Sequence, residues 1–543
     1  MLHLKLYIQD NRKPLPMKTY LIFLLLIVSL LPSHASANNS QLFSYTYSIF
    51  GNWDTGPCPP YGESYQRYMI EHEGRIWYWY HNMSSNEIGY SSTTNGITFT
   101  SFVPIGQTLL WRISVDKDEY GNIHLSWCNG TENSPIYYRC GKLNPNDGSI
   151  SWNSSFQIAV PAEVNITYSR TNIQIDSQGY PWIGYQRWNG SYCEGMVTKS
   201  QWKNGTWKTE TSFPKTVVAT STTSYRVLPK QLPNGKMLIF YASMGTKLYS
   251  RFWNGSGLEP SVEATPWTLM SGGTSVEFSA VSLNDTVYIG CLRDTPRGYY
   301  FFTYNATAKT YSAPLSVTSF PEDCCGIGLC YDLSKNVLYY WVGNYSSSPS
   351  IRSPVLYVFR NNTWILENKR IHEAYRYNGK IHVPEFTSNK NVAMVFTYNP
   401  DYGMASVRVD LHFITVTTVP TLTATITIDG NTYTTPTVVP VATATYTISL
   451  KSYAISGYIF NHWTKRASPE VNIYEQTFSM PVSNDVYLTI HYSPAGYVHP
   501  KPKPIPTPPP QQKHLPIILL LLLVGVLIYL FLKIMKISIT ISS

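Results

Sequence analysis

The chain has 543 residues, of which 43% are hydrophobic, 14% aromatic and only 13% charged. Its formal net charge of +9 comes from the two ends: residues 1–37 contribute +3 and the residues from 498 onward +5, which leaves +1 for everything between. A nearly neutral central region excludes the basic field that nucleic-acid binding requires. The abundance of Tyr and Trp favours sheets packed face to face by large, flat side chains.

The N-terminal segment has the pattern of a secretory signal peptide. A basic residue precedes an apolar run over residues 20–31, and an Ala-x-Ala triplet that ends at Ala37 follows. This order of a basic region, a short apolar core and a small-residue cleavage site is typical of exported proteins. We therefore predict a signal peptide over residues 1–37, with Met1 and Met17 both open as the start.

Seven copies of one pattern follow: a strand, a polar turn, an apolar strand, a short break and a third strand. The apolar strands are expected at residues 75–79, 123–127, 181–185, 237–241, 287–291, 337–341 and 392–396. Their starts lie roughly 50 residues apart, which is the period of a propeller blade rather than of a helical repeat. The fold is therefore predicted to be all-β, with a seven-bladed β-propeller over residues 38–415 and a six-bladed one as the alternative.

The ends of the repeat region complement each other. The last repeat stops after residues 405–413 without an outer strand, whereas a spare strand at 42–48 precedes the first repeat. Pairing the two would close the ring by a hydrogen-bonded seam and remove two exposed sheet edges. This complementarity favours seven blades over six.

All eight cysteines lie in the part of the chain that we predict to be exported, where an even count favours disulfides. Cys128 ends the second strand of its repeat and Cys140 ends the neighbouring third strand, so we predict a disulfide between them. The cysteines at 324, 325 and 330 lack the paired spacing and the nearby histidine of a metal site. We therefore expect no metal and no other cofactor.

Sequons for N-glycosylation are frequent in the repeat region, and most of them lie at predicted turns. The candidate acceptors are Asn82, Asn129, Asn153, Asn165, Asn189, Asn204, Asn254, Asn284, Asn305, Asn344 and Asn361. Each sequon alone is a weak signal, because Asn, Gly and Ser are also ordinary turn residues. Together they favour a glycosylated surface protein.

Residues 92–99, Ser-Thr-Thr-Asn-Gly-Ile-Thr-Phe, resemble the Asp-box of sialidases and BNR-repeat proteins, Ser-x-Asp-x-Gly-x-Thr-Trp, with Thr94 at the aspartate position. The hairpins at 115–127 and 175–185 are similar to the Asp-x-x-Gly hairpins of BNR-type propellers. The resemblance covers about residues 41–413. It implies a sialidase-like β-propeller.

The resemblance also indicates what a site would need: a sialidase is expected to offer three arginines for a carboxylate, a Tyr–Glu nucleophile pair and an acid–base aspartate. Four repeats open with an arginine ahead of or within the first strand: Arg67, Arg112, Arg170 and Arg226. First strands line the channel of a propeller, so these arginines could meet at one mouth and bind a carboxylate or sulfate. Pairing with local acids is the alternative. No residue is assigned a catalytic role.

The C-terminal part changes character. Residues 416–497 are rich in Thr and Val in alternating strands, which predicts an Ig-like β-sandwich, and they resemble the small all-β repeats near the anchors of bacterial and archaeal surface proteins. Proline-dense residues 498–514 predict a stiff polyproline stalk. The uncharged apolar residues 515–532 are long enough to cross a bilayer as a helix, with 533–543 as a cytoplasmic tail.

These features together predict a single-pass cell-surface protein with its N-terminal domains outside the cell. Its sialidase-like propeller is expected to bind an extracellular ligand, with a glycan as the leading candidate. Two alternatives stay open: a surface glycoside hydrolase or polysaccharide lyase of sialidase-like fold, and a structural component of the cell envelope whose partner is another envelope protein. Whether the chain is an enzyme is left undecided.

Overall fold

The computed structural model describes residues 43–46, 66–82, 87–107, 113–153, 155–220, 224–243, 245–269, 271–272, 275–319, 326–345, 352–370, 376–387, 392–399, 404–409, 411–441, 444–466 and 471–495. The predicted signal peptide, stalk, membrane anchor and tail lie outside these residues. Within the described ranges, no helix is long and apolar enough to span a bilayer.

From Met69 to Thr268, the chain forms four antiparallel sheets in succession. Sheet 1 contains β2 (Met69–His72), β3 (Arg75–Asn82), β4 (Glu87–Thr93) and β5 (Val103–Gln107). Sheet 2 contains β6 (Ile113–Lys117), β7 (Asn122–Cys128), β8 (Ile136–Leu143), β9 (Ile150–Trp152) and β10 (Gln157–Val160). Sheet 3 contains β11 (Thr167–Ile175), β12 (Pro181–Trp188), β13 (Cys193–Lys199) and β14 (Lys215–Thr220). Sheet 4 contains β15 (Tyr225–Gln231), β16 (Met237–Ser243), β17 (Lys247–Trp253) and β18 (Val262–Thr268).

Three further sheets complete the repeat region. Sheet 5 contains β21 (Phe278–Leu283), β22 (Thr286–Arg293), β23 (Gly298–Asn305), β24 (Thr310–Tyr311) and β25 (Leu315–Ser319). Sheet 6 contains β26 (Ile327–Asp332), β27 (Val337–Tyr345), β28 (Arg352–Arg360), β29 (Thr363–Arg370) and the parallel β31 (Phe386–Thr387). Sheet 7 contains β30 (Arg376–His382), β32 (Val392–Asn399), β33 (Met404–Val409) and β1 (Phe43–Thr46). The 3-10 turn η1 (Pro233–Gly235) and the short pair of β19 (Ser271–Gly272) and β20 (Ser275–Val276) lie in connections.

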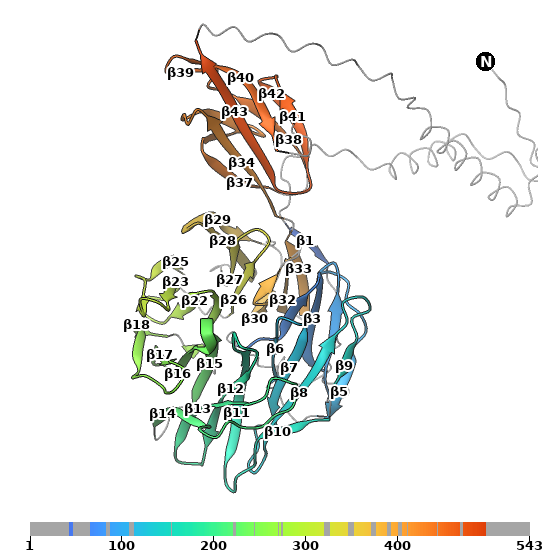
Figure 1. Ribbon diagram of the computed structural model, residues 1–543, viewed down its shortest axis with the longest axis vertical. Helices are drawn as coiled ribbons and strands as arrows, with labels where there is room; N and C mark the ends of the chain where they lie inside the picture. Colours follow the sequence, from blue (N-terminus) through green and yellow to red (C-terminus); the bar gives the residue numbers. More distant parts are fainter. Residues whose placement is uncertain are drawn as a thin grey trace, which may run out of the picture. The chain divides into compact units, whose positions relative to one another are not determined.

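The sheets follow one another around a common axis, with their first strands nearest the centre (Figure 1). Residues of β6, β11, β15, β21 and β26 line one small central cavity, which confirms the central position of first strands. The seven predicted apolar strands are all observed as second strands: β3, β7, β12, β16, β22, β27 and β32. The repeat region is therefore all-β and propeller-like.

Large apolar side chains fill the space between neighbouring sheets. One cluster joins Trp77 and Trp79 of sheet 1 to Leu125 of sheet 2, and another joins Phe301 of sheet 5 to Tyr340 of sheet 6. Both tryptophans are fully buried. Because the described sheets bury side chains on both faces, they form a close-packed support for the loops at their ends.

The predicted seam between the two ends of the repeat region is confirmed. β1 pairs antiparallel with β33, from Phe43 opposite Val409 to Thr46 opposite Ser406. The first and last sheets also meet near the axis, where the Tyr68 and His382 rings lie 4.9 Å apart. The N-terminal strand thus supplies the outer strand of the last sheet and covers its edge.

Deleting residues 42–48 is expected to lower the melting temperature by a few degrees or more and to promote self-association. The deletion removes the β1–β33 ladder and leaves the edge of β33 unpaired, which is a template for pairing with another chain. Calorimetry and sedimentation velocity would measure both effects. A deletion of residues 38–41 is the control, and equal behaviour of the two deletions would contradict a stabilising seam.

The predicted disulfide between Cys128 and Cys140 is wrong. The structure leaves the two sulfurs unjoined, because the β7–β8 register places Cys128 opposite Ile136 and Cys140 opposite His124. Cys128 ends β7 as expected from the sequence, but Cys140 lies within β8, which continues to Leu143. Antiparallel pairing places the end of β7 next to the beginning of β8, away from Cys140.

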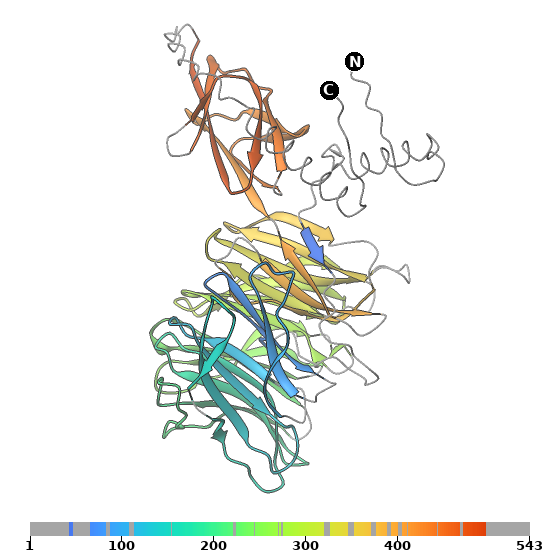
Figure 2. The ribbon, with the colours of Figure 1, turned by 90° about the vertical axis from the view of Figure 1, so that its right-hand side faces the viewer.

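The strands after the repeat region form two sheets (Figure 2). One contains β34 (His412–Val419), β37 (Thr437–Val441), β39 (Ala454–Ile455), β40 (Tyr458–Lys465), β41 (Val471–Ile473) and β43 (Val486–Pro494). The other contains β35 (Thr425–Ile428), β36 (Asn431–Thr434), β38 (Ala444–Leu450) and β42 (Thr477–Val482). Trp463 of the first sheet and Ile426 of the second are fully buried, as expected where two sheets enclose an apolar core.

Candidate functional site

A cavity of about 410 Å³ lies where the first strands of sheets 1 to 3 end and turn into their second strands. We call it the mouth cavity. Its walls are formed by Arg67, Ile70, Glu71, Asp116, Lys117, Asp118, Glu119, Tyr120, Asn122, Gln174, Ile175, Asp176, Ser177, Gln178, Gly179, Lys203, Gln231, Glu385 and Phe386.

Two hairpins on the rim are held by buried aspartates. Asp118 Oδ1 accepts hydrogen bonds from the backbone N–H groups of Tyr120 and Asn122, at 2.9 and 2.8 Å. Asp176 Oδ1 accepts in the same way from Gln178 and Tyr180, both at 2.9 Å. These are the Asp-x-x-Gly hairpins expected from the sequence, and their carboxylates satisfy turn N–H groups.

The Asp-box resemblance places Thr94 at the aspartate position, but a different residue holds the turn between β4 and β5. Asn95 Oδ1 accepts from the N–H groups of Ile97 and Thr98, at 2.9 and 2.8 Å. Asn95, and not Thr94, therefore supplies the turn-holding oxygen of the Asp-box-like segment.

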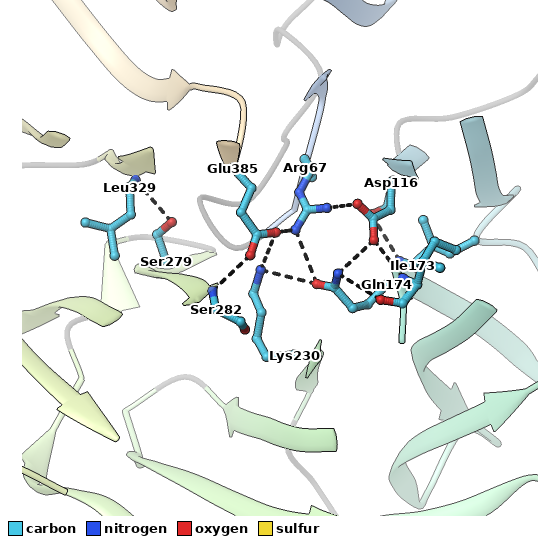
Figure 3. Close-up of polar contacts among 11 residues, drawn as sticks. Arg67, Asp116, Ile173, Gln174, Lys230, Ser279, Ser282, Leu329 and Glu385 are labelled. Carbon is cyan, nitrogen blue, oxygen red and sulfur yellow. Dashed lines mark hydrogen bonds and ion pairs between the residues drawn. The ribbon is translucent and has the colours of Figure 1, made fainter. Parts of the chain in front are cut away.

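A polar network joins residues in the lining of the mouth cavity to one another and to Lys230 (Figure 3). Arg67 pairs with Asp116 on one side and with Glu385 on the other. Asp116 Oδ2 also accepts hydrogen bonds from Gln174 Nε2 and from the Ile175 N–H, both at 2.7 Å. The network thus links groups from sheets 1, 2 and 3 to the segment that follows β30.

Glu385 is the second centre of this network. Its Oε2 lies 2.9 Å from Lys230 Nζ, and its Oε1 accepts from the Ser282 N–H at 3.1 Å (Figure 3). Lys230 Nζ also lies 3.4 Å from Gln174 Oε1. Arg67 and Lys230 therefore balance Asp116 and Glu385 in charge, as buried ions require.

Burial and mutual repulsion act on the two cations. Burial lowers the pKa of Arg67, and Asp116 opposes that effect by its charge and its hydrogen bond. Burial also lowers the pKa of Lys230 well below its ordinary value, and the positive charge of Arg67 adds to the effect. Both groups depend on the two carboxylates to stay charged inside the protein.

The four candidate arginines lie in different surroundings. Arg67 belongs to the network and pairs with acids, as the alternative interpretation anticipated, while Arg112 lies outside the described residues. Arg226 is fully buried and donates from Nη1 to the Ser224 carbonyl at 2.8 Å. Arg170 sits at a bulge in β11 with a φ of 61°.

Arg170 and Arg226 both act on the Cys193 thiol, and neither lines the mouth cavity. Burial raises the pKa of the Cys193 thiol, and the charges of both Arg170 and Arg226 oppose it. Of the three candidate arginines in the described residues, only Arg67 lines the mouth cavity. Joint recognition of a ligand by the four stays a prediction.

A buried histidine lies behind the Asp118 hairpin. His124 is 1% exposed; its Nδ1 lies 2.7 Å from the Tyr138 hydroxyl, and its Nε2 forms an ion pair with Asp118 Oδ2 at 3.8 Å. Burial lowers the pKa of His124, but Asp118 and Cys140 together outweigh it and raise the pKa to about 9. A pKa of about 9 favours the protonated form of this buried imidazole at neutral pH.

The free energy of unfolding is expected to fall by up to about 3 kcal/mol as the pH rises from about 6.5 to about 9. The folded pKa of His124, about 9, lies above the unfolded value, so its stabilisation is complete below the unfolded pKa and is lost as the pH passes the folded pKa. Urea unfolding at a series of pH values measures the slope. A His124→Gln variant should lose the part of this pH slope that His124 contributes. An identical slope in both proteins would contradict a raised pKa of His124.

Most sequons in the described residues present an accessible asparagine. The exposed acceptors are Asn153, Asn165, Asn189, Asn204, Asn254, Asn284, Asn305 and Asn361, while Asn129 is half-buried. The side chains of Asn82 and Asn344 lie outside the described residues. Asn204 follows Lys203 of the mouth cavity directly in the chain.

The fold and the site together define an all-β, propeller-like protein with a polar cavity at the ends of its first strands. No protein-family model matches the chain, and no curated protein matches its sequence.

The chain is similar at low identity to solved structures that include a lyase, a lectin and a sialidase. A polysaccharide lyase, an ulvan lyase, is 10% identical with a TM-score of 0.33 and covers 82% of this chain and 97% of its own. The BP39L lectin from Burkholderia pseudomallei is 8% identical with a TM-score of 0.44, covering 70% and 97%. The Trypanosoma rangeli sialidase is 13% identical with a TM-score of 0.34, covering 65% and 60%. At TM-scores below 0.5, these likenesses do not bear on the ligand.

Sequence reasoning missed most of the network. Glu385 and Lys230 carry no motif, although a lysine within the apolar strand β15 signals a buried partner. In the sequence, Asp116 is distinguished only as a residue of the hairpin at 115–127. The ion-pair and hydrogen-bond partners of Asp116 are Arg67 and Gln174, which lie far from it in the chain, and no local sequence pattern predicts them.

Proposed function

We propose that this chain is an exported, membrane-anchored surface protein whose propeller of seven blades binds a glycan in the mouth cavity. The predicted signal peptide, the sequons and the apolar segment at 515–532 support export and anchoring. The succession of sheets 1 to 7 and the β1–β33 seam support the blade number. The mouth cavity supports the ligand.

The observation that carries the glycan proposal is the composition of the mouth cavity. Its volume of about 410 Å³ lies within the ~300–1,000 Å³ of small-molecule sites. Carboxamide groups in its lining, those of Gln178 and Gln231, can donate to and accept from sugar hydroxyls. Tyr120, which is 69% exposed, offers a flat face for a sugar ring.

The charges of the mouth cavity favour a neutral glycan. Among the described lining residues, the cationic side chains of Arg67, Lys117 and Lys203 face six carboxylates, those of Glu71, Asp116, Asp118, Glu119, Asp176 and Glu385. Lys230 and His124, which do not line the cavity, offset Glu385 and Asp118, so the carboxylates still outnumber the cations by one. Such a surplus of negative charge repels uronate or sulfate groups. A neutral saccharide avoids this repulsion.

The same carboxylates favour binding over hydrolysis. Asp118 and Asp176 accept hydrogen bonds from turns, and Asp116 and Glu385 are paired with Arg67 and Lys230. A glycosidase needs two carboxyl groups that can act as acid and as base or nucleophile. Glu71 Oε1 likewise accepts a hydrogen bond from the Gly74 N–H at 2.7 Å, which leaves Glu119 as a single carboxylate rather than a pair. Binding is therefore our leading proposal and a glycoside hydrolase or lyase the second.

A glycan array probed with the full chain in detergent tests the proposal. We expect the protein to bind neutral glycans on the array more strongly than uronate-containing or sulfated glycans. Tyr120→Ala should weaken retention roughly tenfold or more, as truncation of a central contact does. Tyr192→Ala is the matched control, because Tyr192 is 41% exposed and does not line the mouth cavity. Absence of retention on every glycan, or equal loss in both variants, would overturn the assignment.

A further inference from the structure

A second cavity of about 420 Å³ adjoins the mouth cavity. We call it the side cavity. Both cavities share Ser177, Gln178 and Gln231 as lining residues, so a group that fills one of them lies against the wall of the other.

The side cavity differs from the mouth cavity in its chemistry, since none of the described residues that line it has an ionisable side chain. Four carboxamides, those of Gln178, Gln231, Asn234 and Asn284, surround it. Carboxamides both donate and accept hydrogen bonds without a net charge, which suits the hydroxyl and acetamido groups of a neutral sugar.

One of these carboxamides is itself a glycan acceptor. Asn284 begins the sequon Asn284-Asp285-Thr286, is exposed and lines the side cavity. It is the first residue of a two-residue turn, because Leu283 of β21 pairs with Thr286 of β22. Its φ of 51° is the left-handed conformation that such tight turns require.

The turn is also anchored from outside. The Asp285 carbonyl accepts a hydrogen bond from the Ala306 N–H at 2.7 Å, and its carboxylate accepts from Thr307 Oγ1 at 3.2 Å. A sugar joined to Asn284 Nδ2 therefore starts from a defined point on the wall of the side cavity.

We propose that Asn284 is N-glycosylated and that its first sugars lie in the side cavity against Gln178 and Gln231, where they narrow the mouth cavity. The inference rests on the proposed function, because the modification requires export. In the modification step, Asn284 Nδ2 attacks C1 of a lipid phosphate-linked oligosaccharide. The N–C1 bond forms, the C1–O bond to the phosphate breaks, Nδ2 loses a proton and the lipid phosphate leaves.

The first test is glycopeptide mass spectrometry of the full-length protein purified from membranes of a glycosylating host. We expect a glycan on the peptide that contains Asn284. Thr286→Ala should remove that glycan, and Thr286→Ser, which keeps the sequon, should retain it. An unmodified Asn284 beside a modified Asn254 would overturn the proposal.

The second test measures where the glycan lies and needs no ligand. Gln178→Cys places a thiol on the wall shared by the two cavities, and its rate of labelling by a maleimide–polyethylene glycol is followed by peptide mapping. Adding Thr286→Ala should accelerate labelling about tenfold or more. Adding Asn254→Gln, which removes an exposed sequon that lines neither cavity, should not. Equal rates with and without the Asn284 glycan would overturn the proposal.

The tests separate this proposal from the function on which it rests. A modified Asn284 and slow labelling, in a protein that no arrayed glycan retains, would support the side-cavity proposal and overturn the ligand assignment. If no sequon carries a glycan, both the proposal of export with glycosylation and the Asn284 proposal are overturned. Retention on the array with faster labelling after Thr286→Ala would support both.

Discussion

Replacing Glu385 with glutamine is expected to lower the free energy of unfolding by about 3–5 kcal/mol, the usual result of removing one partner from a buried ion pair. Glu385 is buried and pairs with both Arg67 and Lys230. Glutamine keeps the shape but leaves two buried cations with only Asp116 to balance them. Urea unfolding of the full chain measures the difference.

An exposed ion pair provides the matched control. Glu259 pairs with Lys309 at 2.7 Å on the surface, so Glu259→Gln should cost less than about 1 kcal/mol. The double variant Glu385→Gln with Lys230→Met should recover part of the loss, because it removes the unbalanced charge as well. Equal losses of stability in Glu385→Gln and Glu259→Gln would contradict a stabilising role of the buried network.

Trp182→Ala is expected to cost about 3–5 kcal/mol of stability and to weaken ligand binding at the mouth cavity. The Trp182 side chain is fully buried, with the Phe213 and Trp253 rings at 5.1 and 5.6 Å. Its Nε1 also donates to Asp176 Oδ2 at 2.9 Å. Removing it leaves a cavity in the core and takes a donor from the carboxylate that holds the Ser177–Gly179 turn.

Two further variants separate packing from hydrogen bonding. Trp182→Phe keeps much of the ring packing but loses the Nε1 donor, so it should cost less stability than alanine and still loosen the turn. Trp202→Ala, at a residue that is 43% exposed, should leave stability nearly unchanged. Stability and glycan-array retention are measured on the same preparations. If the Trp182→Phe protein binds arrayed glycans as strongly as the wild type, the hydrogen bond from Trp182 Nε1 to Asp176 does not support the mouth cavity.

Local patterns predicted much of the fold. The apolar strands recur at a fixed period, and all seven are observed as second strands. The spare strand before the first repeat is observed beside the last one. The Asp118 and Asp176 hairpins were visible because a turn residue and its N–H partners lie within four positions of each other. Such features depend on neighbouring residues, which sequence periodicity records directly.

The sequence pattern did not predict how neighbouring strands are aligned in register. Cys128 ends β7, but Cys140 lies within β8 rather than at its end, and the hairpin places the two cysteines opposite Ile136 and His124. A predicted strand boundary carries an uncertainty of a few residues, while a disulfide requires the two Cβ atoms to be within about 4.5 Å. The disulfide prediction failed at that step.

By itself, the sequence determined the all-β repeat, its second strands, its seam and the hairpins at the mouth cavity, because each arises from a periodic or short-range pattern. Only the tertiary structure decided what those hairpins enclose. Lys230 and Glu385 are 155 residues apart, and Arg67 and Gln174 are 107 apart. They meet because first strands of different sheets, and the segments next to those strands, converge on one axis. Charge balance in a buried network depends on that convergence in space, which no stretch of sequence contains.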